Sequence, residues 1–243
     1  MVKDIKIGIV GVGNCASFLL QSIQFYKKDN GKIGDYGIRD IKPVAAFDVD
    51  SRKVDQELSK AIFESSTINT EKIASVPKTG VRVLKGPVLD GVGEYLSKAV
   101  KIDAKQKPVD VTKVLEESEA EILINYLPVG SYDATRYYAE AALKAGCAFI
   151  NCIPEFIVSD KKWTDKFEAK KLPLIGDDIK GQLGASILSR TLVNLFKDRG
   201  CKVDRLYQLN FGGNTDFLNL LEDSRLKFKR ISKTETVQSQ MPK

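Results

Sequence analysis

A glycine-rich segment near the start of the chain has the residue types and spacing of a phosphate-binding turn. Gly11, Gly13 and Ala16 form the pattern GxGxxA between an apolar run and a segment with helical periodicity. The first glycine permits a tight turn, the second lets a pyrophosphate approach the backbone, and the small alanine lets helix and strand pack closely. The free N–H groups of a helix beginning at Asn14 would bind the anion. The pattern predicts a dinucleotide site, and a turn needed only for packing is the alternative.

An acidic residue, Asp48, ends the next strongly apolar run. A carboxylate at this point accepts hydrogen bonds from the ribose hydroxyls of a dinucleotide. Its distance from the glycines exceeds the usual ~20 residues, which an insertion at residues 27–42 explains. Because a carboxylate repels a 2′-phosphate, the sequence predicts NAD and not NADP as the cofactor. The alternative is that Asp48 or Asp50 only caps a following helix.

Polar residues follow three later apolar runs in the same manner. Residues 125–131, 151–155 and 176–180 each begin where a predicted strand ends. Ligands of open α/β sheets bind at the carboxyl ends of the strands, so these residues are candidates for the nicotinamide end of the cofactor. Each segment could equally be chosen for its turn conformation, and Asp178 could cap a helix.

The chain contains no histidine, which excludes Ser-His-Asp and Cys-His catalysis and any histidine-ligated metal site. General acid and base work would fall to Lys, Asp, Glu or Tyr. The four cysteines, Cys15, Cys147, Cys152 and Cys201, form no CxxC pair, so we expect neither a zinc site nor a disulfide framework. We predict buried thiols and no bound metal.

Strands and helices alternate along most of the chain, and they would bring these residues to one edge of a sheet. Residues 27–42 are polar and glycine-rich and are predicted to form an inserted loop. The alternation predicts an α/β fold, a Rossmann-type doubly wound parallel sheet covered on both faces. Predicted strands are residues 5–10, 44–47, 81–84, 122–125, 148–151 and 172–175, and predicted helices are residues 15–26, 91–100, 111–117, 132–145 and 161–170.

The pattern changes after Asp178. Residues 183–196 have the spacing of a buried helix, residues 203–211 resemble a strand, and Ser232 with Glu235 has the form of a capping box that opens another helix. We therefore predict two domains. Residues 1–198 form the NAD-binding domain, and residues 199–243 begin an incomplete α+β catalytic and oligomerisation domain.

The composition favours a small anionic ligand. The 243 residues are 43% hydrophobic and carry a net charge of +6, with basic residues scattered among acidic ones. Such scattering does not form the basic patch of a nucleic-acid binder. The apolar run near the N-terminus is too short and too interrupted for a membrane span or a signal segment. We expect a cytoplasmic protein without nucleic-acid or membrane partners.

Six segments taken together resemble the archaeal and bacterial form of myo-inositol-1-phosphate synthase. The resemblance implies an isomerase that converts D-glucose 6-phosphate to 1L-myo-inositol 1-phosphate in inositol and phospholipid biosynthesis, using NAD without net consumption. It also implies a homotetramer and a chain that stops before further active-site lysines of the family. The segments are residues 11–17, 45–50, 126–130, 176–180, 213–217 and 229–233.

The resemblance also assigns roles to individual residues. It implies catalytic roles for Lys229, Lys233, Asp216 and Asn214, although a lysine pair four residues apart is usually a solvated face. The predicted capping box would place Lys233 in a first helical turn, where a cation is unfavourable unless an anion binds nearby. The cofactor site implied by motif and resemblance comprises Gly11, Gly13, Asn14, Ala16, Asp48, Ser118, Tyr138, Asp178, Gly181, Asp216 and Lys229. At Gly181 many family members have serine.

Two other functions remain compatible with the sequence. One is an ordinary NAD-dependent dehydrogenase of a phosphorylated substrate, which would release NADH at each turnover. The other is a non-catalytic NAD-binding module, because the catalytic part is predicted to be incomplete.

Overall fold

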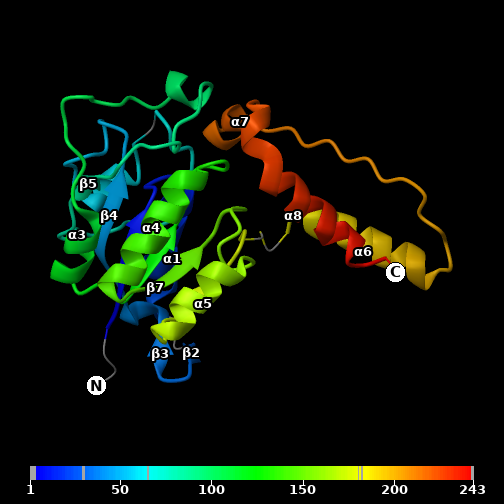
Figure 1. Ribbon diagram of the computed structural model, residues 1–243, viewed down its shortest axis with the longest axis horizontal. Helices are drawn as coiled ribbons and strands as arrows, with labels where there is room; N and C mark the ends of the chain where they lie inside the picture. Colours follow the sequence, from blue (N-terminus) through cyan, green and yellow to red (C-terminus); the bar gives the residue numbers. More distant parts are fainter. Residues whose placement is uncertain (1–3, 29–30, 65, 180, 182, 242–243) are drawn as a thin grey trace.

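A six-stranded parallel sheet forms the centre of the computed structural model, which describes residues 4–28, 31–64, 66–179, 181 and 183–241 (Figure 1). The strand order is β5-β4-β1-β6-β7-β8, and all five neighbouring pairs are parallel. The chain builds outward from β1 in one direction, then returns to its other side with β6. This reversal creates a switch point between β1 and β6, where doubly wound folds bind ligands. The strands are β1 Ile5–Val10, β4 Ile41–Asp48, β5 Val83–Lys85, β6 Ile122–Asn125, β7 Ala148–Asn151 and β8 Leu174–Ile175.

Helices cover both faces of the sheet, because alternate strand residues point to opposite sides. On one face Leu115, Ala139 and Phe167 belong to a buried cluster. On the other face Leu20 and Leu58 belong to a second cluster. This arrangement confirms the predicted fold class. The first cluster draws on α3 Val111–Glu117, α4 Tyr132–Ala145 and α5 Lys161–Ala169, and the second on α1 Asn14–Phe25 and α2 Leu58–Ala61.

The C-terminal part leaves the sheet and returns to it. Helix α6 (Ala185–Asp198) packs against α8 (Lys227–Gln238), and the two project from the sheet as an arm in Figure 1. Between them, α7 (Thr215–Asn219) contacts the 3-10 turn Leu96–Lys98 of the first part of the chain. The return brings α7 to the carboxyl edge of the sheet.

Two predictions about the first part of the chain are wrong. The insertion at residues 27–42 is not a plain loop, because it contains the hairpin of β2 (Lys32–Ile33) and β3 (Tyr36–Gly37), a 3-10 turn at Ile38–Asp40 and the start of β4. The helix predicted at residues 91–100 is only the 3-10 turn Leu96–Lys98. Glycines at positions 91 and 93 make helix formation there unfavourable.

Three predictions about the last part are also wrong. Residues 203–211 form no strand, because no other described strand lies beside them, and most of their side chains are exposed. Helix α6 buries only Ser189 and Val193, so it is not a buried helix. Helix α8 begins at Lys227, which places Ser232 and Glu235 inside the helix and not in a capping box.

Two of the cysteines differ from the prediction of buried thiols. Cys147 and Cys152 are buried, whereas Cys15 and Cys201 are exposed, and all four are free. Among the described residues, no helix is both long and apolar enough to cross a membrane.

Candidate functional site

The glycine-rich turn lies at the switch point of the sheet. Gly11 has φ +83°, and a Cβ there would lie 2.7 Å from the carbonyl oxygen of Tyr126, so only glycine fits. A Cβ at Gly13 would meet no atom within 4 Å. Ala16 is fully buried between α1 and the sheet. The turn is therefore closed by Gly11 and open to a ligand at Gly13, as the motif predicts.

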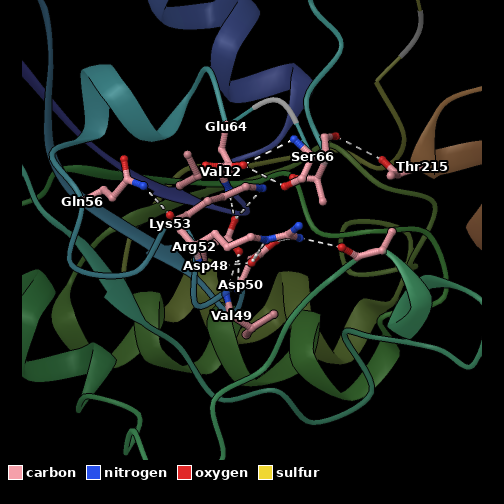
Figure 2. A network of polar contacts seen from close by, with 12 residues as sticks. Val12, Asp48, Val49, Asp50, Arg52, Lys53, Gln56, Glu64, Ser66 and Thr215 are labelled. Carbon is pink, nitrogen blue, oxygen red and sulfur yellow. Dashed lines mark hydrogen bonds and ion pairs between the residues drawn. The ribbon is translucent and has the colours of Figure 1, made fainter.

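Asp48 connects the end of β4 to this turn (Figure 2). Its Oδ2 accepts a hydrogen bond from the Val12 N–H at 2.8 Å, and its Oδ1 accepts from the N–H groups of Val49 and Asp50 at 2.7 and 2.9 Å. The described residues immediately after it form turns, and the next helix begins only at Leu58. Asp48 is therefore not a helix cap, and it shapes the entrance of the glycine-rich turn.

A cavity of about 120 Å³ opens between the turn and the carboxyl ends of β4 and β6, and we call it the glycine-loop cavity. Tyr138 lies in its wall and is nearly fully buried, and this burial raises the pKa of its hydroxyl, which stays protonated. The Oγ1 of Thr67 is buried, and no group of the described residues bonds to it. The lining includes Gly11, Gly13, Asn14, Phe47, Asp48, Lys53, Thr67, Val88, Val92, Tyr126, Tyr138 and Thr215.

The segment around Thr67 is held over the turn by Asn14. The Oδ1 of Asn14 accepts hydrogen bonds from the N–H groups of Asn69 and Thr70 and from the Thr70 hydroxyl at 2.8–3.1 Å. The Asn14 side chain thus fixes a loop, and the residue also lines the cavity at the N-terminus of α1. Sequence reasoning missed Thr67, because a threonine in a polar loop carries no motif.

A second cavity, of about 320 Å³, continues from the first beneath α7, and we call it the α7 cavity. Three chain segments bring carboxylates or amides to it. Asn214 caps α7 by accepting from the Phe217 N–H at 3.1 Å, and Asp178 accepts from the Ser232 hydroxyl of α8 at 2.6 Å. The lining includes Gly13, Asn14, Cys15, Tyr126, Pro128, Cys152, Asp178, Asn214, Thr215 and Asp216.

The two cysteines of the α7 cavity are not nucleophiles. Burial raises the pKa of the Cys152 thiol to about 12. The pKa of the Cys15 thiol is also raised, because the surrounding protein desolvates the sulfur although the residue as a whole is exposed, and because Asp216 lies nearby. Both thiols stay protonated near neutral pH, and the thiolate is the reactive form. Reactive chemistry in this cavity therefore falls to its carboxylates and to cations that reach them.

Of the two predicted catalytic lysines, Lys229 lies beside the carboxylates of the α7 cavity. Its Nζ lies 3.6 Å from the Oδ2 of Asp216, and its side chain is 22% exposed. Lys233 lies elsewhere, because its Nζ donates to the Ser186 hydroxyl of α6 at 2.8 Å. Lys233 also sits in the middle of α8, so the helix-dipole argument for a bound anion does not apply to it.

Two further candidates are not brought to the cavities. Ser118 ends α3 at the amino-terminal side of β6, the sheet edge opposite the cavities, and its hydroxyl donates to the Leu115 carbonyl. Gly181 lies on the exposed segment after β8 and lines neither cavity. Lys180 lies outside the described residues.

The polar residues at the ends of β6 and β7 form an internal network. The Asn125 amide donates to Asn151 Oδ1 at 2.9 Å, and the Asn151 amide donates to Asp177 Oδ1 at 2.8 Å. Asp177 also accepts from the backbone of residues 157–159. These hydrogen bonds fix the ends of β6 and β7 beneath the cavities, while Tyr126, Pro128 and Cys152 of the same segments line the α7 cavity.

A buried arginine, also missed from sequence, attaches the C-terminal part to the sheet. Arg225 donates to the carbonyl oxygens of Val129 and Asp90 at 3.0 and 2.8 Å and to the Ser131 hydroxyl at 3.2 Å. Burial lowers the pKa of its guanidinium. A Cβ at Gly130 would lie 2.3 Å from the Arg225 Cβ, so this contact is close. We call these contacts the arginine latch.

Glu155 predicts a pH dependence of stability. Its carboxylate is buried and pairs with Arg136 at 2.7 Å, but burial outweighs this ion pair and raises the pKa to about 7. The folded chain therefore keeps a proton that the unfolded chain loses above pH ~4.5. We expect the free energy of unfolding to fall by about 3 kcal/mol as pH rises from ~4.5 to ~7. In Glu155→Gln, denaturant unfolding should lose this slope, whereas Glu140→Gln, which removes a half-exposed carboxylate paired with Lys166, should keep it. Equal slopes in both variants would contradict the assignment.

Comparisons with known proteins agree with this geometry. The model of the myo-inositol-1-phosphate synthase family matches residues 184–243. Inositol-3-phosphate synthase of Mycolicibacterium smegmatis is 50% identical over 248 residues, which cover 98% of this chain and 68% of that protein. The corresponding protein of Mycobacterium tuberculosis H37Rv is 48% identical, with 98% and 67% covered.

Two solved structures share the fold. The crystal structure of Ari2 superposes with a TM-score of 0.75 at 33% identity, covering 90% of this chain and 67% of that one. A myo-inositol-1-phosphate synthase-related protein from Thermotoga maritima shares the fold, with a TM-score of 0.71 at 24% identity and 97% and 70% covered. The chain spans about two thirds of the length of these curated relatives. Since half of its residues are identical to those of a synthase along nearly its whole length, the chain belongs to the myo-inositol-1-phosphate synthase family.

Proposed function

We propose that the protein isomerises D-glucose 6-phosphate to 1L-myo-inositol 1-phosphate with NAD as cofactor, in inositol and phospholipid biosynthesis. The observation that carries this proposal is the α7 cavity, where the glycine-rich turn faces Asp178 and Asp216, and Asp216 in turn pairs with Lys229. A cofactor on the turn would thus lie beside carboxylates and an ammonium group.

The residues present fit NAD. Gly13 leaves open space beside the N-terminus of α1, where N–H groups and the helix dipole favour a pyrophosphate. The unpartnered hydroxyl of Thr67 can donate to the same anion. Asp48 can accept from the ribose hydroxyls. NAD, when bound, supplies an acceptor for the C5 hydride of the sugar and later returns it.

The chain's own residues then act on the sugar. A ketone at C5 makes the C6 proton acidic, and the enolate formed on its removal closes the ring by attacking the C1 aldehyde. The Lys229 ammonium, held by Asp216, stabilises the oxyanion that develops in these steps. Asp178 and Asn214 lie where they can orient the sugar.

The test is direct conversion by the protein expressed from its complete gene. We expect inositol phosphate to form from glucose 6-phosphate only when NAD is present, as measured by phosphorus NMR of the products. Formation of a keto sugar phosphate with an equal amount of NADH would identify a dehydrogenase and overturn the proposal. Binding of NAD without any product would identify a non-catalytic module.

The two glycines of the turn give a matched pair of variants. Gly13→Ala should leave the thermal unfolding midpoint unchanged, because its Cβ meets no atom, but should weaken NAD binding at least tenfold because the methyl group displaces the pyrophosphate. Gly11→Ala should instead destabilise the fold by about 1–3 kcal/mol, because it combines positive φ with a backbone clash. Calorimetric titration with NAD and thermal unfolding distinguish them. Unchanged affinity in Gly13→Ala would place the pyrophosphate elsewhere.

We also propose that the enzyme is a homotetramer of the cytoplasm, with a domain boundary near residue 198. The support is the apolar surface of the C-terminal part, where Leu188, Leu195, Tyr207 and Phe211 are exposed. Such surface is covered by other chains in most soluble proteins. We expect residues 1–243 alone to associate or aggregate, as measured by light scattering. A stable monomer would contradict this expectation.

A further inference from the structure

Lys53 is a buried cation in the wall of the glycine-loop cavity. It lies in the turn after β4, where its N–H donates to the Asp50 carbonyl at 2.9 Å, and the residue is 4% exposed. Burying an ammonium group is costly unless acceptors surround it. The Lys53 ammonium group therefore needs hydrogen-bond acceptors or a negative charge nearby.

The described residues supply only part of what Lys53 needs. Its Nζ lies 3.7 Å from the Oδ2 of Asp48, beyond hydrogen-bond distance, and that oxygen already accepts from the Val12 N–H (Figure 2). No other described residue makes an ion pair or hydrogen bond with this ammonium, which has three donors. The donors that remain lie at the cavity wall, beside the carboxylate expected to bind ribose.

The charges around Asp48 also differ from the sequence expectation. Asp50 pairs through both oxygens with Arg52, at 2.8 and 2.5 Å, and Lys53 stands beside Asp48. Two carboxylates thus face two cations, and the local charge is balanced. Repulsion by Asp48 alone does not explain a preference for NAD over NADP.

We infer that Lys53 is a specificity-determining residue that donates a hydrogen bond to the adenosine ribose of the cofactor. The inference rests on the proposed cofactor site. Asp48 accepts from a ribose hydroxyl, which a 2′-phosphate cannot provide, while Lys53 donates to an oxygen that either cofactor provides. The preference for NAD then comes from the need of Asp48 for a hydroxyl donor, and Lys53 determines how strongly a 2′-phosphate binds once the Asp48 charge is removed.

The test measures binding of ADP-ribose and of 2′-phospho-ADP-ribose by calorimetry, so that no turnover is needed. In Lys53→Met, ADP-ribose affinity should fall about tenfold, whereas Lys60→Met, an exposed lysine outside the cavity, should leave it unchanged. Asp48→Asn should weaken ADP-ribose and strengthen the 2′-phosphate form about tenfold, and the double variant Asp48→Asn with Lys53→Met should lose that gain. Thermal unfolding checks each fold, and Lys53→Gln replaces Lys53→Met if the latter does not fold.

The outcomes separate the two hypotheses. If the parent binds ADP-ribose and both Lys53→Met and Lys53→Gln keep the same affinity, the role of Lys53 is wrong, but the proposed cofactor site stands. A gain for the 2′-phosphate form that survives in the double variant would also overturn it. If the parent binds neither nucleotide, the proposed cofactor site fails, and the role of Lys53 fails with it.

Discussion

Lys229→Ala should lower the rate of inositol phosphate formation by about 10² to 10³, while NAD affinity stays nearly unchanged. The reason is that the ammonium, 3.6 Å from Asp216, stabilises negative charge that exists only after the sugar has been oxidised. An interaction made mainly in the transition state affects turnover more than binding. The measurement is steady-state product formation together with calorimetric titration of NAD.

Two variants serve as controls for Lys229. Lys227→Ala removes an exposed lysine from the same helix and should leave turnover unchanged. Lys229→Arg should not restore activity, because a guanidinium is larger and does not release a proton near neutral pH. If turnover of Lys229→Ala stays within a factor of about three of the parent, Lys229 is a solvent-exposed lysine without a catalytic role. Another cation would then have to stabilise the oxyanion.

Arg225→Met should detach the C-terminal part from the sheet and abolish most activity. The substitution leaves the carbonyl oxygens of Asp90 and Val129 without their charged donor, and the loss of such a buried group costs about 3–5 kcal/mol. Helices α7 and α8 carry Asp216 and Lys229, so the α7 cavity would lose the Asp216 carboxylate together with the ammonium group that pairs with it. Limited proteolysis should cut residues 199–238 faster, and product formation should fall at least tenfold.

The matched control for the arginine latch is Arg230→Met. Arg230 forms an exposed ion pair with Asp223, and such pairs contribute little to stability. Proteolysis and turnover should therefore match the parent. If Arg225→Met also behaved like the parent, the latch would not hold the C-terminal part in place.

The elements that sequence predicted accurately are those with strong local signals. Helix α4 and strands β6 and β7 have the predicted bounds. Gly146 marks the end of the helix, and each of the two strands is a short apolar run with clear limits. Residues 203–211 failed for a different reason. A strand is stable only beside a partner strand, and a strand-like residue pattern does not by itself provide that partner. Ser232 and Glu235 fit a capping box in sequence, but a 3-10 turn at Asp223–Leu226 leads directly into α8, which begins at Lys227, about two turns earlier than the capping box predicts.

In the candidate site, too, the residues with a local sequence signal were predicted and those that depend on distant contacts were not. Gly11 and Gly13 were predicted because their spacing encodes a local turn, and Asp48 was predicted because it ends an apolar run. Lys53, Thr67 and Arg225 were missed because their roles depend on contacts between distant segments, such as the 96 residues that separate Arg225 from Val129. Among these, only Lys53 carried a usable signal, since it follows Asp48 closely in sequence. Ser118 and Lys233 were assigned by resemblance, and the structure brings neither to the cavities.

The most direct test of the account follows the hydrogen on C5 of the substrate. The protein from the complete gene is supplied with glucose 6-phosphate deuterated at C5 and with NAD in amounts far below the substrate. An isomerase that returns the hydride predicts inositol phosphate in large excess over NAD, with the deuterium retained on one ring carbon. Product limited to the amount of NAD, with the deuterium found in NADH, would contradict the account and identify a dehydrogenase.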